Sequence, residues 1–107
     1  MPTENKKSYL DCCKQPDLAT IKTVYQSNHD CEALLQCKNC KTYWFYRFNE
    51  YRDDWTVWYS KLTKEEAELI LNAEERPDLD FLKNKPSFME DATGVKKVQG
   101  QPTYPKS

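Results

Sequence analysis

The sequence predicts a small α+β domain with an antiparallel sheet of three to four strands, one helix and an extended C-terminal arm. Three observations support this fold class. The chain has 107 residues, which is the size of one domain. β-Branched and aromatic residues gather between positions 18 and 60, and nine of the 14 aromatic residues lie between positions 43 and 59. A helix signal follows, and prolines recur after position 76.

Four stretches have the composition of β-strands, which favour β-branched and aromatic residues. The predicted strands are Leu18–Gln26, Glu32–Gln36, Thr42–Tyr51 and Trp55–Ser60. The second strand leads directly into Cys37, and the last two are joined by the turn Arg52-Asp53-Asp54. We therefore expect a β-hairpin on each side of residues 37–40.

The strand over 42–51 carries aromatic residues on both of its faces. Because side chains alternate along a strand, one face receives Tyr43, Phe45 and Arg47, and the other receives Trp44, Tyr46 and Phe48. This pattern predicts a sheet that is buried on both sides, with the helix covering one face and the C-terminal arm the other. Arg47, Glu50 and Arg52 are expected to form ion pairs across the hairpin.

The helix has a clear N-terminal signal in Thr63-Lys64-Glu65-Glu66. Thr63 at the N-cap and Glu66 three residues later form the pattern of a capping box. Residues 10–75 are thus predicted to form the domain, residues 1–9 a flexible leader, and residues 76–107 an extended or partly disordered arm.

Cysteine spacing gives the strongest chemical signal. Cys37-Lys38-Asn39-Cys40 is a C-x-x-C motif between two predicted strands, and such a turn brings two thiolates onto one tetrahedral ion, which favours zinc. Residues 1–7 are polar and contain no apolar signal segment, so we expect a cytoplasmic protein. In that reducing compartment, clustered cysteines are more often metal ligands than disulfides.

The complete ligand set is predicted to be Cys12, Cys13, Cys37 and Cys40. Cys31 and His29 are the alternatives for the fourth ligand. If the strand before Cys37 is straight, Cys31 lies about 20 Å from it, at ~3.3 Å per residue, and His29 lies farther away. Cys31 is then expected to be a small buried apolar group, and His29 an exposed turn residue.

Between Asp11 and Leu62 the chain resembles the zinc-ribbon proteins. The resemblance rests on a first cysteine cluster, a β-hairpin, the C-x-x-C knuckle and an aromatic hairpin after it, with 23 residues between Cys13 and Cys37. It implies a structural zinc ion that joins two loops at one end of a three- or four-stranded antiparallel sheet. The first cluster is a vicinal pair and not C-x-x-C, and Lys41 stands where the family often has glycine.

These features predict a non-enzymatic, zinc-stabilised module that binds an unidentified protein partner. The chain has one histidine and two glycines, which leaves no acid–base set and no glycine-rich phosphate loop. Trp and Tyr are common at binding hot spots. The predicted partner-binding residues are Trp44, Tyr46, Phe48 and Trp58.

Two other functions are considered. A zinc ribbon can bind nucleic acid, but 16 basic and 17 acidic residues give a net charge of -1, which argues against nucleic acid. Lys96-Lys97 is the only basic doublet in the predicted arm. A thiol oxidoreductase could use Cys37 and Cys40, but the segment after Cys40 is strand-like, whereas reactive thiols usually begin a helix. No apolar run reaches the ~18 residues that span a membrane.

Overall fold

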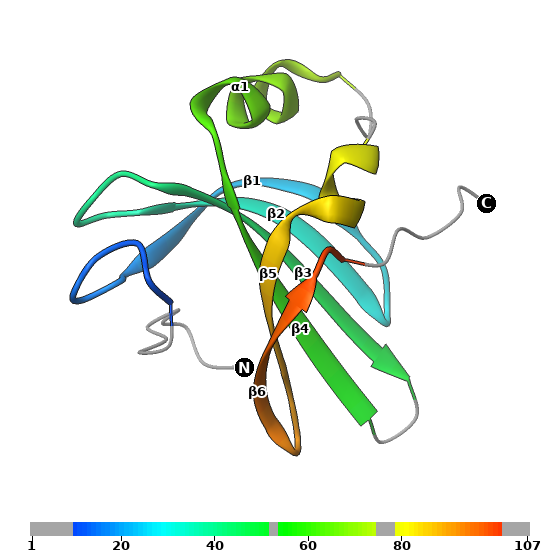
Figure 1. Ribbon diagram of the computed structural model, residues 1–107. Helices are drawn as coiled ribbons and strands as arrows, with labels where there is room; N and C mark the ends of the chain where they lie inside the picture. The colour runs from blue at the N-terminus through cyan, green and yellow to red at the C-terminus, as the bar shows by residue number, and fades with distance from the viewer. Residues whose placement is uncertain (1–9, 52–53, 75–78, 102–107) are drawn as a thin grey trace.

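Six strands form one antiparallel sheet in the order β1-β2-β3-β4-β5-β6, so each strand pairs with its neighbours in the sequence (Figure 1). The computed structural model describes residues 10–51, 54–74 and 79–101. The strands are β1 (Leu18–Gln26), β2 (Asp30–Cys37), β3 (Tyr43–Tyr51), β4 (Asp54–Leu62), β5 (Pro86–Asp91) and β6 (Gly94–Gln99). The helix α1 (Lys64–Asn72) and the 3-10 helix η1 (Asp80–Asn84) lie between β4 and β5.

The structure confirms the small α+β fold, but the predicted count of three to four strands is wrong. β1 to β4 correspond to the four predicted strands, whereas β5 and β6 lie within the segment assigned to the arm. Pro86 does not prevent this hairpin because it is the first residue of β5, a position that proline tolerates. Gly94, with φ 129°, begins β6 after the turn. The predicted leader 1–9, turn residues 52–53 and arm residues 76–78 and 102–107 lie outside the described residues.

The sheet is buried on both faces, and each face has its own apolar cluster. The side chains at alternate positions of β3 divide between the two clusters, as the sequence predicts: Trp44 joins one and Phe45 the other. We call the face of the sheet that carries Phe45 the Phe45 face. On this face, Ala67 and Ile70 of α1 pack with Leu79 and Leu82. The η1 segment of the predicted arm therefore lies on the same face as α1, and not on the opposite face.

The Trp44 face is covered at one end by the segment that precedes β1. Leu10 is 3% exposed and packs into the cluster with Leu18, Leu35 and Trp44. We call this side of the sheet the Trp44 face. Its buried cluster consists of Leu10, Leu18, Ala33, Leu35, Cys37, Trp44, Val57, Tyr59 and Phe88.

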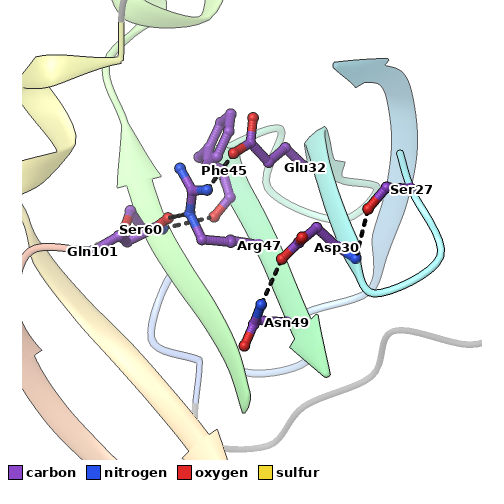
Figure 2. A network of polar contacts seen from close by, with 8 residues as sticks. All are labelled: Ser27, Asp30, Glu32, Phe45, Arg47, Asn49, Ser60 and Gln101. Carbon is purple, nitrogen blue, oxygen red and sulfur yellow. Dashed lines mark hydrogen bonds and ion pairs between the residues drawn. The ribbon is translucent and has the colours of Figure 1, made fainter. Parts of the chain in front are cut away.

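A buried polar network crosses the sheet on the Phe45 face (Figure 2). Arg47 and Glu32 lie directly opposite one another on β3 and β2 and form an ion pair, with 0% and 1% of their side chains exposed. Nε of Arg47 also donates to Oε1 of Gln101 at 3.1 Å, and the side-chain Nε2 of Gln101 donates to Ser60 Oγ. Arg47 thus pairs with Glu32 of β2, whereas the sequence predicted ion pairs of Arg47 within the β3–β4 hairpin. Arg52, which the same prediction includes, lies outside the described residues.

Gly100 allows the end of the described chain to enter this network. Its φ is 86°, and a Cβ there would lie 1.8 Å from the carbonyl oxygen of Lys83. Because only glycine tolerates both conditions, the backbone can pass close to η1. Gln101 is consequently placed in the core, where it is 3% exposed.

Lys22 on β1 links the C-terminal end of α1 to the sheet through hydrogen bonds. Its Nζ donates to the carbonyl oxygens of Ile70 at 2.9 Å, Leu71 at 3.3 Å and Ala73 at 2.7 Å. The last carbonyls of a helix lack the usual i+4 amide partner, although the Ile70 carbonyl also accepts from the Ala73 amide at 3.4 Å. A cation at this end is favoured by the helix dipole. A residue from β1 thereby supplies the positive charge that the last turn of α1 lacks.

The N-terminal end of α1 is held by the predicted capping box, which the structure confirms. Thr63 Oγ1 accepts from the Glu66 amide at 3.2 Å, and Glu66 Oε1 accepts from the Thr63 amide at 2.8 Å. Glu66 also forms an ion pair with Lys85 at 2.8 Å. Burial alone would raise the pKa of Glu66, but Lys85 and the bonds to Thr63 outweigh it and hold that pKa below its usual range.

Replacing Glu66 with glutamine should therefore destabilise the protein in a pH-dependent way. Glutamine can still cap Thr63 but loses the charge, so we expect a cost of about 0.5–1 kcal/mol at pH 7. A lowered folded-state pKa stabilises above the unfolded pKa, near 4.3, and this contribution disappears as the pH falls through the folded value. Urea unfolding of both proteins at equal metal load should show the difference shrinking below about pH 5. A difference that stays constant down to the lowest pH at which both proteins fold would contradict this account.

Candidate metal centre

Four cysteine sulfurs converge at one end of the sheet. Sγ of Cys12, Cys13, Cys37 and Cys40 all lie within 4.8 Å of one another, and Sγ of Cys13 is 3.8 Å from Sγ of Cys37. The loop before β1 and the turn between β2 and β3 project to the same side of the molecule (left in Figure 1). Two segments that are far apart in the sequence thus contribute two thiols each.

The second pair of thiols is positioned by a tight turn. Cys37 is the last residue of β2, its amide donates to the Thr42 carbonyl at 2.9 Å, and the Lys41 amide donates to the Cys37 carbonyl at 2.9 Å. Lys41 adopts a left-handed conformation with φ 69°. Glycine is the residue that adopts such a φ without strain, so Lys41 holds this turn at a conformational cost.

Replacing Lys41 with glycine is expected to stabilise the metal-bound protein. A left-handed non-glycine residue costs on the order of 1 kcal/mol, part of which is offset by the greater freedom of glycine in the unfolded chain. We expect a net gain of about 0.5 kcal/mol for Lys41→Gly and a loss of about 1 kcal/mol for Lys41→Val, because a β-branched residue tolerates this φ poorly. Chemical denaturation of the three proteins measures both changes, and a valine variant as stable as the parent would show that the turn is not strained.

The first pair of thiols is fixed against this turn by backbone hydrogen bonds. The chain bends at residues 12–15, the Lys38 amide donates to the Asp17 carbonyl at 2.8 Å, and Asn39 Nδ2 donates to the Gln15 carbonyl. The bend brings the side chains of both vicinal cysteines into the cluster. Lys38 and Asn39, the two residues between the knuckle cysteines, therefore link the two loops.

The thiols of the two loops differ in acidity. Burial alone would raise the pKa of Cys37, but hydrogen bonds with the backbone of Asp17, Cys40 and Asn39 outweigh it and lower that pKa to about 6. The pKa of Cys40 is also lowered, since bonds with Thr42 outweigh its burial. Burial raises the pKa of Cys12 to about 12 and raises the pKa of Cys13 as well. Four neighbouring thiolates repel one another, so complete ionisation requires a cation in their midst.

Two side chains outside the predicted ligand set, Trp44 and Thr42, lie next to the cysteine cluster. The indole Nε1 of Trp44 is buried and has no hydrogen-bond partner among the described residues. Burial raises the pKa of Cys12, and the indole of Trp44 partly offsets this rise. Oγ1 of Thr42 lies 3.2 Å from Sγ of Cys40. Their position just after Cys40 was the available signal, because Thr42 and Trp44 are two and four residues beyond it.

Replacing Trp44 with phenylalanine is expected to weaken metal binding while the fold persists. The change removes the N–H donor but keeps an aromatic ring in the core, and losing such an outer partner costs about 10-fold to 100-fold in metal affinity. Trp55→Phe is the matched control, because Trp55 packs on the same face away from the four sulfurs. Competition with a chromophoric zinc chelator measures both affinities. Equal affinities for the two variants would exclude a role for the indole N–H.

The four sulfurs fit a single tetrahedral ion. Zinc–sulfur bonds of about 2.3 Å in a tetrahedron place neighbouring sulfurs about 3.8 Å apart. The Cys13–Cys37 distance of 3.8 Å matches this spacing, and the remaining sulfur pairs all lie within 4.8 Å. Four cysteines close together can therefore bind a metal ion.

The other residues considered from the sequence lie elsewhere. Cys31 is near the opposite end of β2, where it pairs with Phe48 and Gln26, and His29 is exposed before that strand. Trp44 is 1% exposed on the face that also carries the half-buried Tyr46 and Phe48. Trp58 is 9% exposed and lies opposite Arg47, hence on the other face. The four predicted partner-binding residues do not form one surface.

Comparisons with protein-family models, with curated proteins and with solved structures find no match to this chain. Neither described helix has the length and apolar character that a membrane crossing requires. The interpretation of the site therefore depends on its own geometry and chemistry.

Proposed function

We propose that this chain is a non-enzymatic protein-interaction module whose fold is held by a structural zinc ion. The observation that carries the proposal is the convergence of four cysteine sulfurs from two separate loops. A site with four protein ligands leaves no open position for a substrate or a reactive water, which is the arrangement of structural zinc sites.

Zinc is the metal that best suits this donor set. Four thiolates favour a soft ion and a tetrahedral geometry, which zinc and iron–sulfur centres share. The predicted cytoplasmic, reducing environment keeps these thiols available as ligands. The site holds two loops together next to the Trp44 face, as the resemblance to zinc ribbons implies.

The contact surface of the module is proposed to lie on the Trp44 face. Tyr46, Phe48 and Trp55 are only partly buried there, and they come from the adjacent strands β3 and β4. Contiguous exposed aromatic groups are typical of binding surfaces. This set replaces Trp44 and Trp58, whose side chains are too buried to form a contact surface.

Native mass spectrometry of the purified protein, with and without a chelator, tests the zinc site. We expect one zinc ion per chain, lost on chelation together with the cooperative thermal transition. A mass that corresponds to iron would reject zinc as the resident ion. A metal-free protein with the same transition would reject the structural role altogether.

The alternative functions make different predictions. Nucleic-acid binding predicts retention on heparin and oligonucleotides that weakens steeply with salt. Thiol oxidoreductase activity predicts disulfide reduction by the metal-loaded protein and rapid alkylation of Cys37. We expect neither result, and either one would displace the proposed function.

A further inference from the structure

A cavity of about 330 Å³ opens on the Trp44 face beside the four cysteines. Its apolar wall consists of Trp44, Phe88 and Pro86, and the ring centroids of Trp44 and Phe88 are 6.2 Å apart at 43°. Asp11, next to Cys12, is also part of its wall. The volume is at the lower end of the range for small-molecule sites, so it suits one ring or one branched side chain.

Two lysines place positive charge over this apolar wall. Nζ of Lys61 is 5.7 Å from the ring centroid of Trp44, and Nζ of Lys97 is 5.7 Å from that of Phe88. Each lysine lies directly opposite its ring across a strand pair. Both ammonium groups are thus fixed on the same face of the sheet by the register.

The charges of the cavity do not cancel. Lys61 forms an ion pair with Asp11 at 2.9 Å, but among the described residues no carboxylate pairs with Lys97. The cavity therefore carries one excess positive charge above an aromatic wall. A ligand that complements it needs one negative charge attached to an apolar group.

We propose that this cavity binds an apolar carboxylate, with its apolar group against Phe88 and Pro86 and its carboxylate at Lys97. The inference rests on the proposed function and names what the module binds. The same chemistry occurs in a small aromatic acid and in the C-terminal residue of a protein that ends in an apolar side chain. Lys61 contributes a second cation when the ligand competes with Asp11.

Phenylacetate and phenylacetamide are the two probes that test the proposal, since they differ in charge and share the ring. Both are titrated into the isotope-labelled, zinc-loaded full chain and followed by amide and indole chemical shifts. We expect phenylacetate to bind with a dissociation constant of about 1 mM, typical of so small a ligand, and to shift the Trp44 indole signal. The amide should bind about twofold to fivefold more weakly, which is the contribution of one exposed ion pair.

Lys97→Gln has an unusually close control in Lys96→Gln. The two residues are adjacent on β6 and therefore point to opposite faces of the sheet. We expect Lys97→Gln to weaken phenylacetate binding about fivefold and Lys96→Gln to leave it unchanged. Asp11→Asn should strengthen binding about twofold, because it frees Lys61.

A matched peptide pair assigns the natural source. A peptide with a free C-terminal phenylalanine that binds more tightly than phenylacetate, and loses this on amidation, indicates a protein C-terminus. A peptide that binds more weakly than phenylacetate indicates a small acid. Absence of saturable binding, equal binding of acid and amide, or equal effects of the two lysine variants would overturn the proposal. The zinc content of each sample is measured separately. A zinc-loaded protein that does not bind the probes contradicts the ligand proposal alone, whereas a zinc-free protein contradicts the proposed function.

Discussion

Replacing Cys37 with serine is expected to abolish metal binding and the cooperative unfolding transition. Cys37 is fully buried and lies within 4.8 Å of the other three sulfurs. Structural zinc contributes apparent binding free energies of about 10–16 kcal/mol in small domains, whereas a whole domain is stable by only about 5–15 kcal/mol. Losing one of four ligands therefore removes a contribution as large as the entire stability. Native mass spectrometry and thermal circular dichroism measure the two losses.

Cys31→Ser is the matched control for this experiment. Cys31 lies on the same strand and the same face as Cys37, six residues away, and outside the sulfur cluster. We expect this variant to keep its zinc ion and to melt within a few degrees of the parent. A Cys37→Ser protein that behaves like Cys31→Ser would contradict the structural role of the site.

Acidification should release the metal from the parent protein in the same assay. Metal binding requires four thiolates, and protons compete for the same sulfurs. Burial raises the pKa values of Cys12 and Cys13, so these thiols give up protons when the ion binds. Zinc affinity should accordingly increase with pH.

The convergence of the four cysteines follows from sequence signals that are local. Two thiols in a four-residue motif converge within a single turn, whatever the rest of the chain does. Strands β1 to β4 have dense β-branched and aromatic composition, and the capping box of α1 spans only four residues. None of these features requires knowledge of a distant partner.

The β5–β6 hairpin was missed because its composition is polar and because the prolines spread over residues 76–107 suggested an interrupted arm. Lys96, Lys97 and Val95 on β6 are exposed, as expected of an edge strand, and charged residues are common on such edges. β5 is specified mainly by pairing with β4, where Phe88 lies opposite Tyr59. That contact depends on the sheet register, which composition does not reveal.

The buried ion pair was missed for a related reason. Arg47 has acidic and basic neighbours in its own hairpin, and these suggested ion pairs there. Its partner is Glu32, which becomes adjacent only when β2 and β3 align in their observed register. The available indication was that Glu32 and Arg47 each stand between two apolar residues in the sequence and belong to predicted strands.

Replacing Glu32 with glutamine is expected to destabilise the protein strongly. Glu32 and Arg47 are 1% and 0% exposed, so Glu32→Gln removes the negative charge that faces the buried guanidinium of Arg47 in this ion pair. Removing one partner of a buried pair costs about 3–5 kcal/mol. Urea unfolding at pH 7, with zinc bound to both proteins, measures the loss.

A double variant separates the cost of breaking the pair from the benefit of having it. In Glu32→Leu/Arg47→Met both charged side chains are replaced by shorter apolar ones, so neither charge of the pair remains in the core. Such replacements are often neutral or stabilising, because two charged groups no longer lose their hydration on folding. Gln101, which accepts from Arg47 Nε at 3.1 Å, would keep its bond to Ser60. We expect the double variant to recover most of the 3–5 kcal/mol lost in Glu32→Gln. If the double variant is as unstable as Glu32→Gln, the ion pair stabilises this core more than apolar side chains at the two positions do.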